Sequence, residues 1–439
     1  MHFIADFHIH SKYSRATSKD MDLENLDKWA KIKGIDVLGT GDFTHPLWFK
    51  ELKTKLEPAE PGLFKLRQTS KVKLNNGWLP PGNQGQVRDL RYILTTELSC
   101  IYKKGNRTAK IHLMIFVPSL EVVEKINAHL GWLGNLKADG RPILGLDAKE
   151  LAKIVLNISA EALIVPAHAW TPWFSIFGSM SGFDSIEECF DEYSKYIYVI
   201  ETGLSSDPAM NWRLSKLDRI TLISNSDAHS PHRIGREANV FEGKIEDYKY
   251  LIEALRLGRR APASIKNRLT KTIEFFPEEG KYHYDGHRNC QIVFSPEETI
   301  KNKGLCPVCK KPLTVGVMSR VQKLADRPVG FKSVNSIPFV SLIPLEEIIA
   351  ESFGVGVGTK TVEREYKDLI NKFGNEFKIL TEINQTELAS AAKPEVAEGI
   401  WRVREGRVKI EPGYDGEYGK IKIFDEAERS NFSKQSTLF

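Results

Sequence analysis

The chain has 439 residues, of which 27% are charged and 41% belong to the apolar set, and this composition excludes a mostly disordered protein. The net charge is +5, and the basic residues are concentrated in 50–110, 256–271 and 299–332, which favours contact with a polyanion such as nucleic acid. The start has no signal-peptide pattern, and no apolar run approaches the roughly 18 residues of a membrane span. The five cysteines indicate a reducing compartment and a metal site rather than disulfides. We therefore expect a soluble, cytoplasmic protein of about three domains.

Short β-branched runs alternate with helical patterns over residues 1–262. Strands are predicted at 3–7, 35–40, 91–96, 111–116, 162–166, 197–202 and 220–225. Helices are predicted at 22–33, 119–130, 147–157 and 245–257. Buried strands that alternate with helices favour a parallel sheet, and these strands can close into a barrel. The predicted fold class is α/β, with a β/α barrel over 1–262.

The pattern changes after residue 262. Residues 263–330 carry Pro, Gly and Cys and predict a small zinc-binding domain. Residues 331–424 predict a mainly helical domain that ends in short strands, and 425–439 predict a flexible, polar tail. The Gly-rich segment 354–361 lacks the spacing of a phosphate-binding loop. The segment predicts a glycine turn between two helices. The turn either only allows the helices to pack together or also places its backbone amides against a DNA phosphate.

Histidines and carboxylates follow successive predicted strands. The strand ends of a parallel barrel converge on one face, where active sites are built. So many imidazoles and carboxylates on one face would repel one another or be poorly solvated unless cations bound them. Any one of them could instead be an ordinary core or surface residue, but the joint pattern indicates Zn²⁺, Mn²⁺ or Fe²⁺, and more than one ion. The candidate ligands are His8, His10, Asp42, His45, Glu97, His112, His168, Asp227 and His229.

A second candidate metal site lies in the cysteine-bearing segment. His287, Cys290, Cys306 and Cys309 form two short pairs at the spacing of a tetrahedral structural zinc site. His283 is an alternative to His287, and unliganded thiols are the alternative to a zinc site. With four protein ligands such a site is closed to water, so the zinc would be structural. The lysines around it would make a small basic module that grips phosphates.

The blocks DFHIH, TGDFTH, TTELS, IHLMIF, PAHAW and SNSDAHS resemble the polymerase and histidinol phosphatase (PHP) family. The resemblance implies a distorted seven-stranded β/α barrel that holds several metal ions for phosphoester hydrolysis. It implies ligand roles for His8, His10, Glu97, His112, His168, Asp227 and His229, with Glu97 bridging two ions. Phe43 follows Asp42 where the family has His, so Asp42, His45 or both remain candidates. The residues expected to carry catalysis are His8, His10, Glu97, Asp227 and His229.

The barrel, the zinc-binding segment and the helical region together resemble the endonuclease Q family. This resemblance implies a DNA repair endonuclease that cleaves double- or single-stranded DNA 5′ to uracil, hypoxanthine, xanthine or an abasic site. Zn²⁺ would fill the structural site and the catalytic cluster, with Mg²⁺ or Mn²⁺ as alternatives in the cluster. Two other functions remain open, a phosphatase for a small phosphomonoester and a non-catalytic DNA-binding partner of the sliding clamp.

Two further groups of residues are candidates for contact with a base or with a partner protein. Trp170, Trp173 and Phe174 are candidates for a pocket that receives an extruded base, or else pack under a loop. Gln435, Leu438 and Phe439 resemble the beginning of a motif that binds the PCNA sliding clamp. The alternative for this tail is a frayed end. We expect a monomer with no membrane partner.

Overall fold

The computed structural model describes residues 1–70, 89–262, 264–334, 336–425 and 428. Its main sheet has 11 strands, with the order β15-β12-β11-β1-β2-β5-β4-β3 and with β6, β7 and β8 attached through β5 and β6. The strands are β1 (His2–Asp6), β2 (Val37–Gly39), β3 (Leu56–Pro58), β4 (Leu63–Leu66), β5 (Arg91–Lys104), β6 (Arg107–Val117), β7 (Ile143–Leu144), β8 (Leu163–Pro166), β11 (Ala238–Glu242), β12 (Arg268–Glu274) and β15 (Phe339–Ser341). A separate parallel pair is formed by β9 (Val199–Glu201) and β10 (Thr221–Ile223).

All seven predicted strands are present, as β1, β2, β5, β6, β8, β9 and β10. The expectation of a parallel sheet is wrong in part. The neighbours β1, β2 and β5 are parallel, but β6 is antiparallel to both β5 and β8. A short turn at Gly105 joins β5 to β6, and strands joined without a crossover helix run antiparallel. Two backbone hydrogen bonds connect the β9–β10 pair to its neighbours. The Ala169 amide donates to the Glu201 carbonyl (2.9 Å), and the His10 amide donates to the Ala228 carbonyl (3.0 Å).

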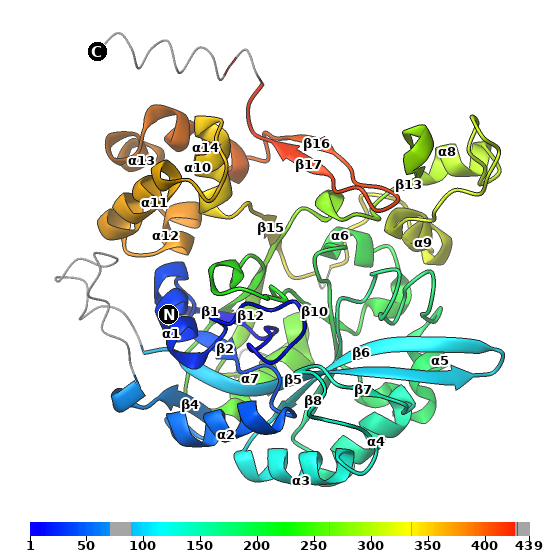
Figure 1. Cartoon of the computed structure of the whole chain (residues 1–439), viewed down its shortest axis with the longest axis vertical. Helices are drawn as coiled ribbons and strands as arrows, with labels where there is room; N and C mark the ends of the chain where they lie inside the picture. The colour runs from blue at the N-terminus through cyan, green and yellow to red at the C-terminus, as the bar shows by residue number, and fades with distance from the viewer. Residues whose placement is uncertain (71–88, 263, 335, 426–427, 429–439) are drawn as a thin grey trace.

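Helices cover the sheet, as Figure 1 shows for α2, α3 and α4 along one side. The helix α1 begins where the Asp22 side chain accepts from the Asn25 amide, and it ends at Gly34 in the left-handed region. The four predicted helices are confirmed as α1, α3, α4 and α7. The helices of this part are α1 (Leu23–Lys33), α2 (Pro46–Lys55), α3 (Leu120–Leu130), α4 (Ala148–Ile158), α5 (Ile186–Phe190), α6 (Pro208–Asn211) and α7 (Tyr248–Leu257).

The sheet extends beyond the first predicted segment. The strand β12 pairs antiparallel with β11, and β15 pairs in parallel with β12. The expected boundaries at 262 and 330 therefore each leave one strand of the main sheet in the segment that follows. These strands are short or alternate polar and apolar residues, so the sequence gives only a weak signal for them.

The remaining elements form two smaller groups at one end of the molecule (Figure 1). One holds β13 (Asp285–His287), β14 (Ile292–Phe294), α8 (Pro296–Lys301) and α9 (Val317–Leu324). The other holds α10 (Leu345–Phe353), α11 (Lys360–Phe373), α12 (Glu376–Thr381), α13 (Gln385–Ala391) and α14 (Pro394–Arg404). The turn between α10 and α11 confirms the predicted helix–turn–helix hairpin. The hairpin of β16 (Lys409–Glu411) and β17 (Lys420–Lys422) follows.

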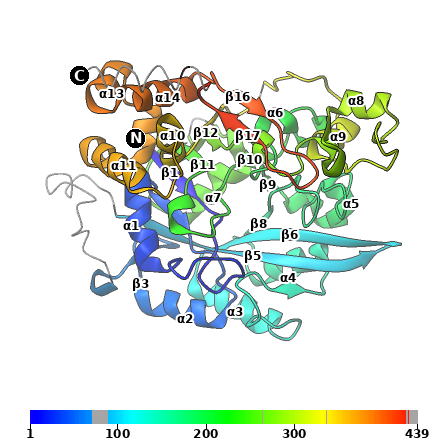
Figure 2. The ribbon, with the colours of Figure 1, turned by 45° about the horizontal axis from the view of Figure 1, so that its top comes forward.

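Specific contacts connect these groups with each other and with the sheet. Asp415, in the turn after β16, accepts hydrogen bonds from the Arg288 amide (2.6 Å) and the Thr314 hydroxyl (2.6 Å). Figure 2 shows this hairpin reaching toward α9. On the other side, Lys33 of α1 and Glu376 of α12 form a buried ion pair of 2.7 Å. Within the described ranges, no helix has the length and apolar content needed to cross a bilayer.

Candidate metal centre

Most of the candidate ligands follow strand ends, as the sequence predicts, but Glu97 and His112 lie inside β5 and β6, which are longer than the predicted strands. His8 and His10 follow β1, and a backbone bridge between Ile9 and Ala228 draws them toward the segment after β10. That segment carries Asp227, whose φ of 46° turns its side chain out of the strand direction. Glu97 and His112 lie on the paired strands β5 and β6, and His168 follows β8 with a φ of 30°.

Three of these side chains form one group of potential metal ligands. One donor atom from each of His8, His10 and Asp227 lies within 4.8 Å of the others. The Nε2 atoms of both histidines and Oδ1 of Asp227 are buried and make no hydrogen bond of acceptable geometry, although His10 Nε2 lies 3.1 Å from Asp227 Oδ1. Buried polar atoms without partners are rare in native proteins, because each loses its hydration. Two imidazole nitrogens and a carboxylate oxygen that converge in this way fit a divalent cation.

A second group adjoins the first. Glu97 Oε1 lies 2.8 Å from His112 Nδ1 and 3.0 Å from His168 Nε2. The other oxygen of Glu97 lies 3.2 Å from His10 Nε2, in the first group. Glu97 is therefore placed between the two groups. This is the position that a carboxylate bridging two cations would occupy.

A second layer of side chains orients these histidines. Glu201 accepts from Nδ1 of His8 (3.0 Å) and from the His168 amide (2.7 Å). Asp42 lies 3.0 Å from Nδ1 of His10, and the hydroxyl of Thr171 lies 3.1 Å from Nδ1 of His168. A carboxylate on one ring nitrogen fixes the tautomer and turns the other nitrogen toward a metal. The second layer leaves Nε2 of His8 and of His10 available for a cation.

Three predicted ligands lie beside the two groups rather than within them. Both oxygens of Asp42 are already engaged, by His10 and by the Ser11 and Ser14 side chains. His45 precedes α2 and stacks on Tyr13, with its buried Nδ1 lacking a hydrogen-bond partner. The ring of His229 lies 4.6 Å from that of His10, and its Nδ1 donates to the Asp227 carbonyl. The Asp42 carboxylate therefore lies behind the His10 ring, outside both ligand groups.

The electrostatics of the centre favour bound positive charge. Burial alone would lower the pKa of His8, but the carboxylates of Glu201, Glu97 and Asp227 raise it well above its usual value. Burial would raise the pKa of Glu97, but its interactions with the His112 ring first and then with the Arg141 guanidinium hold it well below its usual range. The cluster therefore requires cations, supplied by protons or by metal ions.

Sequence reasoning missed two residues of the centre. Glu201 is the last residue of β9 and the penultimate residue of the predicted strand 197–202, so its place near a strand end was a usable signal. Arg141 comes from the loop before β7, and its Nη1 donates to Glu97 Oε2 at 3.0 Å. No local pattern marks Arg141, because it lies in an irregular loop and its partner Glu97 is 44 residues away in the sequence.

The second predicted metal site also assembles. Donor atoms of His287, Cys290, Cys306 and Cys309 lie within 4.8 Å of one another, with Cys309 Sγ 3.6 Å from His287 Nδ1. The turn after Cys306 is held by its own backbone, since the amide of Lys310, which has a φ of 60°, donates to the Cys306 carbonyl. Three thiols and one imidazole in this arrangement suit a tetrahedral zinc ion. The alternative ligand His283 stacks on Tyr284, outside this group.

The candidate aromatic pocket is only partly at the surface. Trp170 is fully buried, and its indole N–H donates to Asn211 at 2.8 Å, as the alternative of packing under a loop implies. The ring of Phe174 lies 4.7 Å from that of His112, beside the metal centre. Trp173 is 38% exposed and its ring meets that of Tyr282. The tail residues Gln435, Leu438 and Phe439 lie outside the described residues.

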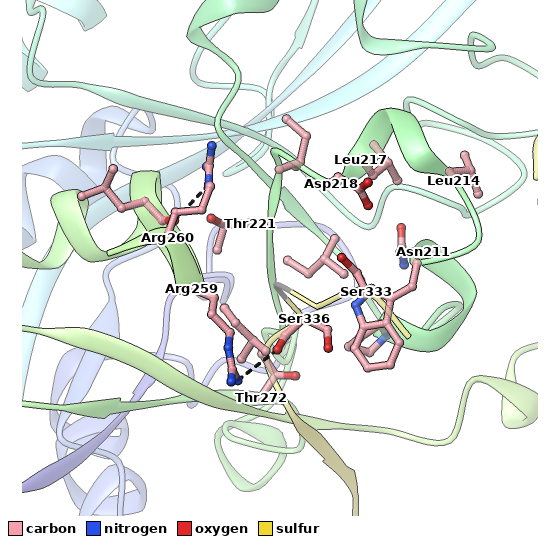
Figure 3. A pocket seen from close by; sticks show the side chains of 16 residues that line it. Asn211, Leu214, Leu217, Asp218, Thr221, Arg259, Arg260, Thr272, Ser333 and Ser336 are labelled. Atoms are coloured by element: carbon pink, nitrogen blue, oxygen red, sulfur yellow. Dashed lines mark hydrogen bonds between the residues drawn. The ribbon is translucent and has the colours of Figure 1, made fainter. Parts of the chain in front are cut away.

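The cavity in Figure 3 does not belong to the metal centre. It is lined by Thr221 at the beginning of β10 and by Arg259 and Ser336, which hydrogen bond to each other at 3.2 Å. The metal centre lies instead beyond the other end of β10. At about 40 Å³ the cavity has room for water molecules but not for a nucleotide.

Comparisons with known proteins agree with this architecture. A PHP-associated family model matches residues 212–259, and a model of the MJ0043 C-terminal domain matches 344–407. Protein MJ0043 of Methanocaldococcus jannaschii is 36% identical over 263 residues, which are 58% of this chain and 31% of that protein. The chain thus spans about a third of that relative.

Two solved structures resemble nearly the whole chain. The lesion-specific endonuclease PfuEndoQ from Pyrococcus furiosus is 31% identical, with a TM-score of 0.81 over 97% of this chain and 96% of that one. An endonuclease Q complex with a 27-mer duplex substrate, which has an abasic lesion at the active site, is 31% identical, with a TM-score of 0.80 over 98% of each chain. The fold and the paired ligand groups define a metal-dependent hydrolase of the PHP class. The chain belongs to the endonuclease Q family.

Proposed function

We propose that this protein is a DNA repair endonuclease that hydrolyses the phosphodiester 5′ to a deaminated base or an abasic site. The observation that carries the proposal is the pair of adjoining ligand groups, with Glu97 of one 3.2 Å from His10 of the other, in a fold matched by a lesion-specific endonuclease. The related complex with an abasic duplex supports DNA as the substrate class. Uracil, hypoxanthine and xanthine are proposed as further lesions.

The chain's own residues would prepare the reaction as follows. His8, His10 and Asp227 would hold one cation, and Glu97, His112 and His168 a second. Such cations lower the pKa of water to give a nucleophile at neutral pH and neutralise the phosphate and the leaving oxygen. Glu201 and Asp42 keep the histidine rings oriented. Zn²⁺ is proposed for these groups, with Mg²⁺ or Mn²⁺ as alternatives, and His229 is proposed as an additional ligand.

Arg141 is placed to contribute positive charge beside the reacting phosphate. Its side chain is 28% exposed, and its guanidinium donates to Glu97 at 3.0 Å. Arginine presents several donors in a planar fork that matches phosphate oxygens. We propose that Arg141 binds a non-bridging oxygen of the scissile phosphate and so stabilises the charge that develops there.

A panel of substrates tests the proposed function. End-labelled duplexes with one uracil, hypoxanthine, xanthine or abasic site, and one undamaged duplex, are incubated with the protein and a divalent metal. We expect a single nick on the 5′ side of the lesion and none in the undamaged strand. Hydrolysis of small phosphomonoesters alone would support the phosphatase alternative. DNA binding without cutting would support the non-catalytic alternative.

The positioning role of Asp42 gives a graded prediction. Asp42→Asn should reduce incision about 10- to 100-fold, the usual cost of removing a carboxylate behind a metal-binding histidine. Part of the loss should be recovered at higher metal concentration, because the variant weakens the orientation of His10 rather than removing a ligand. Metal titrations of incision by wild type and variant measure this shift. A loss that excess metal leaves unchanged would contradict it.

We also propose that the tail binds the sliding clamp. Deletion of 434–439 should leave incision of a short oligonucleotide unchanged and remove stimulation by the clamp, because a tethered peptide raises the local enzyme concentration. Calorimetry of a 425–439 peptide with the clamp, beside nicking of closed circular DNA, measures both effects. A truncated enzyme that the clamp stimulates as well as the full chain would refute the proposal.

A further inference from the structure

The loop 131–142 connects the surface of the molecule to the metal centre. β6 runs antiparallel to β5, so the helix α3, which follows it, returns toward the edge where the metal centre lies. At the far end of the loop, the amide of Gly140 donates to the Tyr13 carbonyl at 3.1 Å, and Arg141 donates to Glu97. The next residues form β7, which pairs with β5 at Ser99 and Cys100, just beyond Glu97. The loop therefore lies on the substrate side of the strands.

The beginning of this loop presents a tryptophan to solvent. Trp132 is 91% exposed, which makes it the most exposed aromatic side chain among the described residues. Leu133, beside it, is 45% exposed, and Ile143 at the end of the loop is 59% exposed. Single exposed apolar residues are ordinary, but three around one loop at a candidate active site indicate a contact surface.

The turn that carries Trp132 is held firmly. The amides of Leu133 and Gly134 both donate to the Leu130 carbonyl, at 2.9 and 3.0 Å, so the turn continues from the end of α3. Gly134 lies against Leu144, where an added Cβ would clash. Leu144 pairs with Cys100, three residues or about 10 Å along β5 from Glu97. The turn that carries Trp132 therefore lies against β7, which pairs with the part of β5 that follows Glu97.

The charged residues around the loop indicate which class of molecule would contact Trp132. Lys137 is exposed within the loop, and Arg141 lies at its end. The side chain of Arg15, which is 82% exposed, reaches Asp139 of the same loop. Basic side chains around an exposed apolar residue are typical of proteins that hold the phosphate backbone and insert a wedge between bases. A DNA duplex fits this surface better than a neutral protein partner.

We propose that Trp132, supported by Leu133, inserts into the duplex beside the lesion and stacks on the base left behind when the damaged nucleotide is extruded. This inference rests on the proposed function. Extrusion breaks the stacking of the neighbouring bases, and an aromatic ring that replaces the missing base recovers part of that energy. Trp132 would then act only where the lesion lies in a duplex, because a single strand has no stack to open.

The test compares duplex and single-stranded forms of one labelled deoxyuridine oligonucleotide. Trp132→Ala should lower kcat/KM on the duplex about 10- to 100-fold, within the range of one base–aromatic stack, and change it less than about twofold on the single strand. Trp132→Phe should restore most of the duplex activity. With no divalent metal added, 2-aminopurine opposite the lesion should be less fluorescent with wild type than with Trp132→Ala, because stacking on an aromatic ring quenches this base.

Tyr196→Ala is the matched control, an exposed aromatic that precedes β9 and so lies at the opposite edge of the strands. It should leave both activities unchanged. Equal cutting of the duplex by Trp132→Ala and wild type would overturn the inference, as would an equal loss on both substrates, which indicates a structural role. If wild type cuts neither DNA form, the proposed function itself fails.

Discussion

His8→Ala and Asp227→Asn should each lower DNA incision by at least about a thousandfold, since several kcal/mol of metal-derived stabilisation correspond to such a factor. Both residues contribute unpaired donor atoms to the first ligand group, so either change removes a ligand rather than core packing. The fold should persist, with a melting temperature close to that of wild type. Single-turnover incision of a deoxyuridine duplex measures the loss, and circular dichroism measures the melting temperature.

His2→Ala is the control for this pair of variants. His2 lies at the other end of the same strand, β1, and is exposed. Its replacement should leave incision within about twofold of wild type, as expected of an ordinary surface change. Cutting by His8→Ala or Asp227→Asn at the wild-type rate and equal metal concentration would show that the first ligand group does not take part in hydrolysis.

Cys306→Ser should release zinc from the cysteine-bearing module and lower its thermal stability. Cys306 is fully buried in the four-residue group, and the energy of binding a structural zinc, about 10–16 kcal/mol in small zinc peptides, is folding energy. DNA affinity should fall more than the rate of the chemical step, since loosening of the module removes basic contacts such as Lys310.

Zinc content, calorimetric melting and DNA affinity at a fixed salt concentration measure these effects together. Cys100→Ala is the control, since Cys100 is a buried core thiol on β5, away from the zinc group. It should lower stability through a cavity and keep the zinc. A Cys306→Ser protein that keeps its zinc and its melting temperature would show that the four residues do not bind zinc.

The sequence predicts which strands form better than how they pair. Runs such as 91–96 and 162–166 are apolar and rich in β-branched residues, so the local sequence is enough to predict them as strands. The direction of β6 depends on the turn at Gly105, which joins two runs that the sequence treats as separate. β12 and β15 pair with each other across more than 60 residues, so their place in the main sheet depends on tertiary contacts that no local pattern shows.

Some residues of the candidate site can likewise be predicted from local sequence, whereas others depend on tertiary contacts. The pair His8 and His10 sits directly after a strand, and this local pattern is enough to place both at the strand-end face. Whether Asp42 contacts a metal or a histidine depends on the Ser11 and Ser14 hydroxyls that occupy its oxygens. Arg141 reaches Glu97 through an irregular loop, so only the folded chain brings them together.

Reconstitution of incision from metal-free protein tests the central claim most directly. The protein is stripped with a chelator that leaves the cysteine-bound zinc in place, and Zn²⁺, Mn²⁺ or Mg²⁺ is then added with a duplex that contains one deoxyuridine. We predict no cutting before addition, and after it a single nick 5′ to the lesion, whose dependence on metal concentration requires more than one ion. A nick formed at the full rate without added metal, or cutting that His8→Ala preserves under the same titration, would contradict the account.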